Sequence, residues 1–338
     1  MKNFPDLQIA VAGASGAVGQ VMLELLLERG VPARSISALA SPRSAGDIVS
    51  AGGQDFALAA LDEFDFAGTD LALFSAGAEV ARRHAPRAVA AGCVVIDNSS
   101  AFRTDLDIPL VVPEVNGGVL DRWRPPGIIA NPNCSTIQMV MALQPLAAAA
   151  GLERVHAMTW QSVSGKGRLA LEELARQTAA RLNFQAIESK VFPQPIAFNV
   201  LPQVDDFEAD GSTREEWKMI REARRLLCLP DLALTATAVR VPVFYGHAVA
   251  LHLRTVEALP LERAAALLAA LPGVRFAAEP AAYPTPLTHA AGHDEVHVGR
   301  LRRDPCDPQG LCLWVVADNI RKGAALNAVQ IAERLVRR

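Results

Sequence analysis

The sequence lacks the signatures of several protein classes. Its five cysteines are scattered, odd in number and without a C-x-x-C pair, which argues against a zinc site and against a disulfide framework. No stretch approaches the ~18 uninterrupted apolar residues of a membrane-spanning helix, and the first residues show no basic segment before an apolar core, so we expect no signal peptide. The net charge of −3 gives no basic footprint for nucleic acid. We therefore expect a cytoplasmic protein with reduced thiols that binds no metal, membrane or nucleic acid.

The 338 residues are enough for two domains with substantial cores. In the first half, short apolar runs alternate with helical patterns, which predicts a mostly parallel sheet. In the second half, period-two alternation predicts a mixed sheet with helices. The fold class expected is α/β, with a Rossmann-like parallel-sheet domain and an α+β domain. We place the first domain at residues 1–133, completed by a C-terminal helix at 320–338, and the second at 134–319. Expected strands include 7–12, 36–40, 71–74, 94–96, 111–112, 155–163, 236–243, 247–253 and 310–316.

Three glycines follow the first expected strand. The spacing Gly13-x-x-Gly16-x-x-Gly19 stands between an apolar run and a helical pattern, which is the context of a dinucleotide fingerprint. Gly13 permits the tight turn, Gly16 lets the backbone approach a pyrophosphate, and Gly19 lets the helix pack on the strand. The alternative is a glycine-rich turn in another kind of α/β protein.

The loop after the second expected strand bears on the choice of cofactor. An NAD-preferring enzyme usually carries an acidic residue here for the ribose hydroxyls, whereas this chain has Arg43 followed by Ser44. An arginine suits the 2′-phosphate of NADP(H), although a solvated loop arginine would look the same.

Cys134 stands at the predicted start of a helix, after an apolar run and a Pro-bearing turn. Unpaired N–H groups and the positive end of the helix dipole converge there, and both favour the nucleophilic thiolate. The alternative is a buried structural cysteine.

A nucleotide fold with a cysteine nucleophile suggests aldehyde oxidation through a thioester, which needs a base, oxyanion donors and cations for an anionic substrate. His247 follows a glycine turn, seven residues after Arg240, and together they offer a base and an anion clamp. Arg103 lies in a loop after a strand, where it could bind phosphate or carboxylate. A structural histidine and a surface salt bridge are the respective alternatives.

Seven segments, in order and over nearly the full length, resemble the aspartate-β-semialdehyde dehydrogenase family: 13–19, 97–103, 131–138, 161–165, 215–218, 240–247 and 318–330. The resemblance implies that Cys134 forms the acyl-thioester, that His247 is the acid/base, and that Gln161 orients the substrate. It also implies that Arg240 holds the substrate carboxylate and Glu215 its amino group, while Arg103 and Lys218 bind phosphate. Contacts to NADP would come from Ser15, Gly16, Ala17, Val18, Arg43, Ser44, Ser164, Gly165 and Asn319.

The same resemblance implies a reaction and an assembly. The reaction is the NADPH-dependent reductive dephosphorylation of 4-phospho-L-aspartate to L-aspartate 4-semialdehyde, on the way to diaminopimelate, lysine, methionine and threonine, with inorganic phosphate as co-substrate of the reverse direction. Members of the family are homodimers, and some are homotetramers. The resemblance also implies that the first domain binds NADP and that the second serves catalysis and dimerisation. One departure is Lys166, which stands where a small residue is expected.

Three alternatives remain. N-acetyl-γ-glutamyl-phosphate reductase uses the same thioester chemistry, but the Arg43-Ser44 loop and the 215–218 segment fit the aspartate enzyme better. A non-catalytic relative would be expected to lose Cys134 or His247, and both are present. A glyceraldehyde-phosphate dehydrogenase-like enzyme lacks support because the chain has no Ser-Cys-Thr-Thr-Asn run.

Overall fold

A computed structural model describes residues 3–337. It divides into two compact units. The first comprises residues up to 133 together with those from 324 onward, and the second comprises Cys134–Gly323. The chain therefore leaves the first unit once and returns to it for its last helix. No helix among the described residues is long and apolar enough to cross a membrane.

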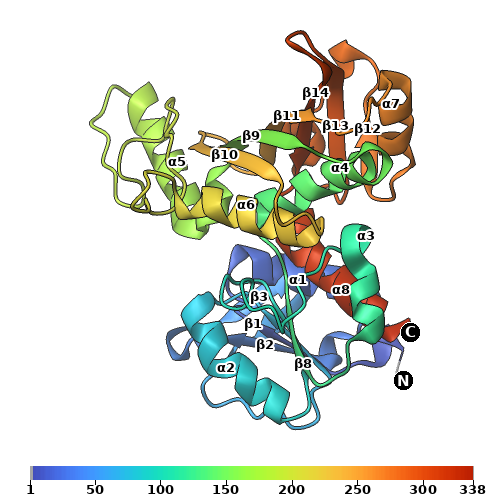
Figure 1. Ribbon diagram of the computed structural model, residues 1–338. Helices are drawn as coiled ribbons and strands as arrows, with labels where there is room; N and C mark the ends of the chain where they lie inside the picture. Colours follow the sequence, from blue (N-terminus) through green and yellow to red (C-terminus); the bar gives the residue numbers. More distant parts are fainter. Residues whose placement is uncertain (1–2, 338) are drawn as a thin grey trace. The chain divides into compact units, whose positions relative to one another are not determined.

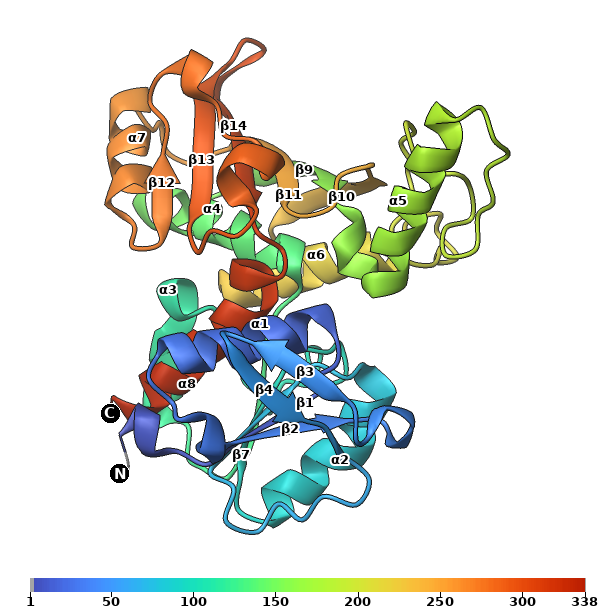
Figure 2. The same ribbon diagram turned by 180° about the vertical axis from the view of Figure 1, so that it is seen from behind.

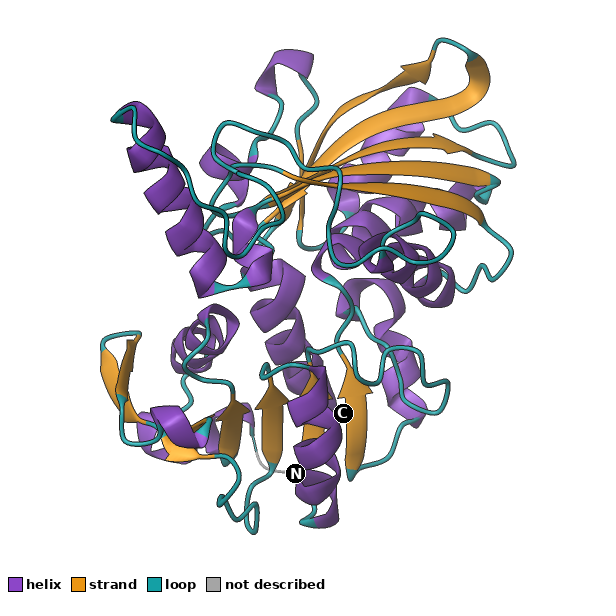
Figure 3. Ribbon diagram, turned by 90° about the vertical axis from the view of Figure 1, so that its left-hand side faces the viewer, coloured by secondary structure: helices purple, strands orange, loops and turns teal. Residues whose placement is uncertain are grey.

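The first unit contains a six-stranded sheet in the order β5-β2-β1-β6-β7-β8, in which every neighbouring pair is parallel. Its central strands are apolar on both faces because helices cover both sides of the sheet (Figures 1 and 3). The strand order changes direction between β1 and β6, which is the switch point where ligands bind in such sheets. The strands are β1 (Ile9–Ala12), β2 (Ile36–Ala40), β5 (Ala59–Ala60), β6 (Leu71–Phe74), β7 (Val94–Asp97) and β8 (Gly127–Ala130).

The two faces of this sheet carry separate cores. On one face, α1 (Ala17–Glu28) and α8 (Leu326–Val336) pack on Ile9 and Val11. On the other, α2 (Ala78–Ala90) packs on Ala10 and Ala12. A short antiparallel hairpin of β3 (Ile48–Ala51) and β4 (Gln54–Ala57) packs beside α1 (Figure 2), and α3 (Pro113–Asn116) lies against α8. The last helix of the chain is thus part of the first core.

The second unit contains a mixed six-stranded sheet in the order β10-β9-β11-β14-β13-β12. β9 and β10 are parallel, as are β12 and β13, and the other neighbouring pairs are antiparallel. β9 alternates exposed and buried residues, because helices cover only one of its faces. The strands are β9 (Arg154–Gln161), β10 (Ala233–Arg240), β11 (His247–Arg254), β12 (Val274–Phe276), β13 (Val296–Asp304) and β14 (Asp307–Ala317).

Helix α4 (Cys134–Ala150) crosses this sheet and is buried around most of its circumference. Its sequence is apolar on nearly every face, because the helix packs on strands on one side and on other helices on the other sides. α6 (Arg214–Leu226) and α7 (Leu261–Ala270) flank α4, while α5 (Arg168–Leu182) builds a smaller core of its own with residues 192–201. A π-helical turn at Arg321–Ala325 connects to α8.

The predicted fold class is confirmed: a parallel-sheet domain precedes a mixed-sheet domain. The strand expected at 111–112 is wrong, since only an isolated bridge joins Leu110 to Ala130. The run is apolar because it is fully buried, and Pro109 and Pro113 on either side limit how far it can pair. No sequence pattern predicted the β3–β4 hairpin, α6, β12 or β13.

Candidate active site

Two of the predicted catalytic side chains and one predicted substrate-binding side chain meet at one end of the mixed sheet. Gln161 is the last residue of β9 and is the register partner of Arg240, the last residue of the parallel strand β10. His247 begins β11, which runs antiparallel to β9, so its first residue lies beside the end of β9. All three are at most 5% exposed. The pairing of the strands therefore brings together residues that are 86 positions apart in the sequence, from Gln161 to His247.

Cys134 is placed at this site by the turn that precedes α8. It is the first residue of α4 and is partly exposed. A Cβ atom built on Gly323 would lie 2.9 Å from the Cβ of Cys134, so only a glycine fits against the cysteine at that position. Cys134 also acts electrostatically on Arg240, where its negative charge opposes the lowering of the arginine pKa that burial causes. Cys134 is thus close enough to Arg240 for their charges to interact.

His247 is held in a defined protonation state. The backbone N–H of Ser162 donates to its Nδ1 at 3.1 Å, so Nδ1 accepts and the neutral ring carries its proton on Nε2. Burial, followed by the charge of Arg240, lowers the pKa of His247 to about 3. Nε2 is buried and has no hydrogen-bond partner among the described residues. The ring is therefore a neutral donor with its N–H unused.

Nε2 of His247 lies next to Gly165. A Cβ atom on Gly165 would lie 3.3 Å from Nε2 of His247 and 3.3 Å from Nη1 of Arg240. The absence of a side chain leaves room there for a ligand atom that both groups could reach. Arg240 is oriented by a 2.7 Å hydrogen bond from Nη1 to the carbonyl oxygen of Ser162. Geometry of this kind suits the stabilisation of a developing oxyanion.

Ser164 and Asn319 form a buried network behind the histidine. The Oδ1 atom of Asn319 accepts hydrogen bonds from Ser162 Oγ, Ser164 Oγ and the backbone N–H of Gly246. The Nδ2 atom of Asn319 lies 2.9 Å from Ser164 Oγ. These bonds fix the chain on both sides of His247. Ser162 carried no predicted role, although it stands inside the motif that suggested Gln161.

Glu215 and Lys218 lie one turn apart on α6, which begins with a capping box between Thr213 and Glu216. Glu215 accepts a hydrogen bond from Gln161 Nε2 at 3.1 Å. Lys218 Nζ donates to Asp205 at 2.6 Å and to Glu215 at 3.4 Å. Lys218 is therefore already engaged by two carboxylates, and no sequence pattern pointed to Asp205.

Arg103 belongs to the first unit, in the loop after β7, where its Nη2 donates to the carbonyl oxygen of Asn98 at 2.8 Å. Lys166 Nζ, the departure noted in the sequence, lies 5.8 Å from the centre of the Phe192 ring. That distance corresponds to a cation–π contact within the second unit.

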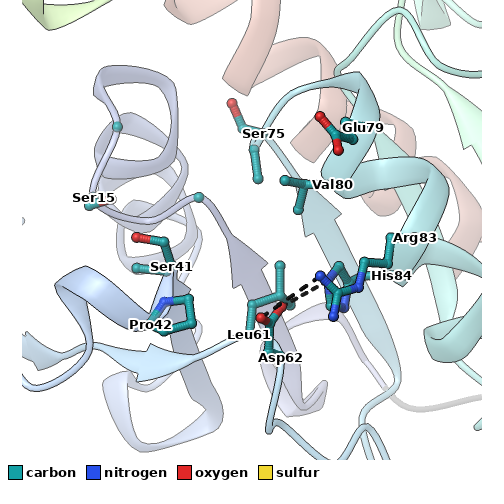
Figure 4. A pocket seen from close by; sticks show the side chains of 14 residues that line it. Ser15, Ser41, Pro42, Leu61, Asp62, Ser75, Glu79, Val80, Arg83 and His84 are labelled. Atoms are coloured by element: carbon teal, nitrogen blue, oxygen red, sulfur yellow. Dashed lines mark ion pairs between the residues drawn. The ribbon is translucent and has the colours of Figure 1, made fainter.

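The first unit contains a cavity of about 450 Å³ at the carboxyl ends of β1, β2, β5 and β6 (Figure 4). It lies at the switch point of the parallel sheet. Gly13 has φ +89°, and a Cβ there would lie 2.5 Å from the Ser75 carbonyl oxygen, while a Cβ on Gly19 would lie 2.2 Å from the Gly13 oxygen. Helix α1 begins after Gly16 without a side-chain cap, so its first N–H groups remain for an anion. These features fit a dinucleotide.

The lining of this cavity includes Gly13, Ser15 and Gly16 among the predicted cofactor residues. Ala17 and Val18 begin α1, and Arg43 and Ser44 form the turn after β2, next to the lining residues Ser41 and Pro42. None of these four is itself among the lining residues. Ser164, Gly165 and Asn319 lie in the second unit.

Asp62 and His84 line another side of the cavity and, with Arg87, form a cluster of charged and titratable side chains. No sequence pattern predicted this cluster. His84 lies between Asp62, 3.0 Å from Nε2, and Arg87, 2.7 Å from Nδ1 (Figure 4 shows the pair with Asp62). Arginine can only donate, so Nε2 of the neutral ring carries the proton. Burial, then Arg87, lowers the pKa of His84. These residues stand in no recognisable motif, and only the fold brings Asp62 to α2.

Comparisons with known proteins agree with both units. Residues 8–123 match the family model "semialdehyde dehydrogenase, NAD binding domain", and residues 143–322 match "semialdehyde dehydrogenase, dimerisation domain". The fold and the site therefore define a nicotinamide-dependent oxidoreductase of the semialdehyde dehydrogenase class. The dimerisation domain indicates homo-oligomerisation.

Comparisons with individual proteins identify the family within this class. The chain is 52% identical to the aspartate-semialdehyde dehydrogenase of Legionella pneumophila, covering 98% of this chain and 96% of the relative. It is 49% identical to that of Shewanella violacea, with 98% of each covered. A crystal structure of aspartate semialdehyde dehydrogenase II from Vibrio cholerae, complexed with ASA, superposes with a TM-score of 0.95 at 47% identity, covering 100% of this chain and 99% of that one. The chain belongs to the aspartate-semialdehyde dehydrogenase family.

Proposed function

We propose that this chain converts 4-phospho-L-aspartate to L-aspartate 4-semialdehyde through a thioester on Cys134. The observation that carries the proposal is the convergence of Gln161, Arg240 and His247 at one end of the mixed sheet, in the unit whose first residue is Cys134. The Cys134 thiolate attacks the acyl phosphate carbonyl, a C–S bond forms, the C–O bond to phosphate breaks, and inorganic phosphate leaves. In the reverse direction phosphate is the co-substrate.

The nicotinamide supplies the hydride that reduces the thioester carbonyl. In this step His247 Nε2–H donates to the carbonyl oxygen as negative charge develops there, beside the cation of Arg240. The oxyanion then re-forms the carbonyl as the C–S bond breaks, which releases the aldehyde and the Cys134 thiolate, while the neutral His247 ring keeps its Nε2 proton hydrogen-bonded to the oxygen. These steps call for the side chains named above and the bound nicotinamide, and we propose that no metal takes part.

The remaining assignments follow from the charges at the site. Arg240, buried and held by Ser162, binds the α-carboxylate of the substrate. Glu215 takes the substrate amino group, and Gln161, its hydrogen-bond partner, orients the acyl group. Lys218 and Arg103 bind the phosphate group. Lys218 would do so by exchanging its contact with Asp205 for the phosphate, because both are anionic partners of one ammonium group.

We propose NADP(H) as the cofactor, with Gly13, Ser15, Gly16, Ala17 and Val18 around the pyrophosphate and Arg43 and Ser44 on the 2′-phosphate. The support is the position of the Arg43 turn directly after the lining residues Ser41 and Pro42. Asp62 also lines the cavity, and its Oδ1 atom is paired with Nε2 of His84. Ser164, Gly165 and Asn319 are assigned to the nicotinamide end.

We also propose a homodimer in the cytoplasm. The matched dimerisation domain supports self-association, and five free cysteines suit a reducing compartment. Light scattering after gel filtration tests the assembly, and a tetramer would correct it.

The test of the function is the reverse reaction. Purified protein is mixed with phosphate, NADP and aspartate semialdehyde, and NADPH formation is followed by absorbance. Parallel arms contain N-acetylglutamate semialdehyde, or NAD in place of NADP. Activity confined to the acetylated substrate would assign the reductase alternative, and inactivity with every substrate would favour a non-catalytic relative. Arg43→Ala should lose preference for NADP over NAD; equal use of both by the wild type would refute the 2′-phosphate assignment.

A further inference from the structure

Three potential metal ligands of different chemistry come together on three neighbouring strands of the mixed sheet. His252 on β11 is the direct register partner of Cys312 on β14, and Asp304 ends β13, the strand on the other side of β14. Nδ1 of His252 lies 3.6 Å from Sγ of Cys312. One ligand atom from each of the three residues lies within 4.8 Å of the other two.

This cluster is separate from the reacting groups of the same unit. His252 lies five residues after His247 on β11, so the two side chains point to opposite faces of the sheet. At ~3.3 Å per residue, their backbones are about 16 Å apart along the strand. An ion held by His252 therefore does not touch His247 in the same chain.

The donor set selects the class of ion. An imidazole nitrogen, a thiol sulfur and a carboxylate oxygen suit Zn²⁺ and neighbouring transition metals, whereas Mg²⁺ and Ca²⁺ prefer oxygen alone. The strand ladder fixes the backbones of His252 and Cys312, so little ordering is needed on binding. Oδ1 of Asp304 accepts the backbone N–H of Cys306 at 2.9 Å, which orients the carboxylate and leaves its other oxygen for an ion.

A pocket reaches one of the three proposed ligands. A pocket of about 250 Å³ borders His252 and is also lined by Tyr283, Arg300 and Arg302, which are exposed. Arg302 is the register partner of Cys312 and donates to the Arg300 carbonyl oxygen at 2.9 Å. Burial raises the pKa of the Cys312 thiol, and the charge of Arg302 acts in the opposite direction.

We propose that His252, Asp304 and Cys312 bind one divalent transition-metal ion of the zinc class, with water in the fourth position. The ion crosslinks three strands and is not part of the aldehyde chemistry. Sequence spacing does not reveal such a site, because its ligands lie 8 to 60 positions apart, one on each strand, and not in a short metal-binding motif.

Cobalt titration of the reduced protein tests the proposal, because a Co²⁺–thiolate bond gives a charge-transfer band in the near ultraviolet. The wild type should develop the band with one equivalent of Co²⁺, and Zn²⁺ should displace it. Cys312→Ser should abolish the band. His252→Gln and Asp304→Asn should each weaken Co²⁺ binding by more than about tenfold. Cys228→Ser, which removes an exposed cysteine, is the matched control and should titrate like the wild type.

Cys134→Ser separates this site from the catalytic thiol. The Co²⁺–thiolate band should persist in Cys134→Ser, and its loss in that variant would overturn the proposal. An unchanged band in Cys312→Ser would overturn it equally. If Cys312→Ser does not fold, as judged by circular dichroism, the two conservative variants decide: wild-type affinity in both His252→Gln and Asp304→Asn rejects the site.

Discussion

Gly165 is the residue on which access to the reacting groups depends. We expect Gly165→Ala to lower kcat/KM by about 100-fold, because a methyl group 3.3 Å from both Arg240 and His247 would occupy the space proposed for the substrate. Stability should change little, since φ at Gly165 is not positive. Steady-state kinetics and a thermal melt measure the two effects. Gly118→Ala, where the nearest atom to a new Cβ is 3.9 Å away, is the control; equal kinetics for both variants would contradict the assignment of this space.

His247 links stability to pH. Its pKa falls from 6.5 to about 3 on folding, first through burial. Between these values the unfolded chain binds a proton that the folded chain does not, so the stabilising contribution is complete above pH 6.5 and is lost as the pH falls toward 3. The slope is about 1.4 kcal/mol per pH unit.

Urea unfolding at pH 7 and pH 5 measures this effect. The wild type should lose more stability on acidification than His247→Gln, which has no titrating group at that position. His84, whose pKa is also lowered, contributes with the same sign to both proteins and cancels in the comparison. Identical pH dependence in the two proteins would place the proton uptake elsewhere.

At this scale the residues singled out from the sequence stand at the first or last position of a strand or helix. Cys134, Gln161, Arg240 and His247 stand at such boundaries, where pattern and chemistry coincide. The sequence did not predict Ser162, Asp205 or His84, because their roles depend on which partner the fold brings near. A serine that fixes a tautomer through its backbone N–H has no signature in its side chain.

At the scale of elements, the π-helical turn Arg321–Ala325 positions the nucleophile. We expect Gly323→Ala to reduce turnover by about 100-fold, because its Cβ would lie 2.9 Å from that of Cys134 and would displace the thiol. The rate at which iodoacetamide modifies Cys134 should change in parallel. Ala324→Gly in the same turn adds no atom and tests whether flexibility alone is responsible. Wild-type turnover in Gly323→Ala would show that this contact does not position the thiol.

Strands and helices whose apolar residues recur with a clear period could be predicted from the sequence, and the other elements could not. β11 and β14 alternate or run apolar for many residues, so both were found within a few positions. Helix α6 was missed because charged residues dominate its sequence and several are buried: Glu215, Glu216 and Glu222 point inward to partners. Short strands such as β12 carry too few residues for a period to stand out.

At the scale of the whole molecule, the return of α8 to the first unit predicts the effect of truncation. Leu326, Val329 and Ile331 are buried in the core formed with β1 and α1, and each contributes ~1.5–3 kcal/mol. Their sum approaches the ~5–15 kcal/mol that stabilises a typical domain. A chain ending at Gly323 should therefore lose nucleotide binding.

Calorimetry with NADP and far-ultraviolet circular dichroism measure this loss. A permuted chain that places 324–338 ahead of residues 1–133, through a flexible linker, should restore NADP binding without the second unit. The short 3-10 helix Phe4–Asp6 contacts α8, so the linker can be short. Full NADP affinity in the truncated chain would show that α8 is dispensable to the first core.

The return of the chain also sets an order of events during synthesis. A ribosome completes residues 134–323 before it makes the last helix of the first unit. The residues made first therefore wait, with the apolar side of β1 and α1 uncovered, until the end of the chain has left the ribosome. We expect stalled nascent chains that carry, after Gly323, a flexible spacer long enough to bring that residue out of the ribosomal exit tunnel to be cleaved by protease within residues 1–133 and protected within 134–323. Protection of both regions would mean that the early segment folds without its last helix. The part of the protein that is made first is thus the part that is finished last, and its dependence on chaperones should be correspondingly greater.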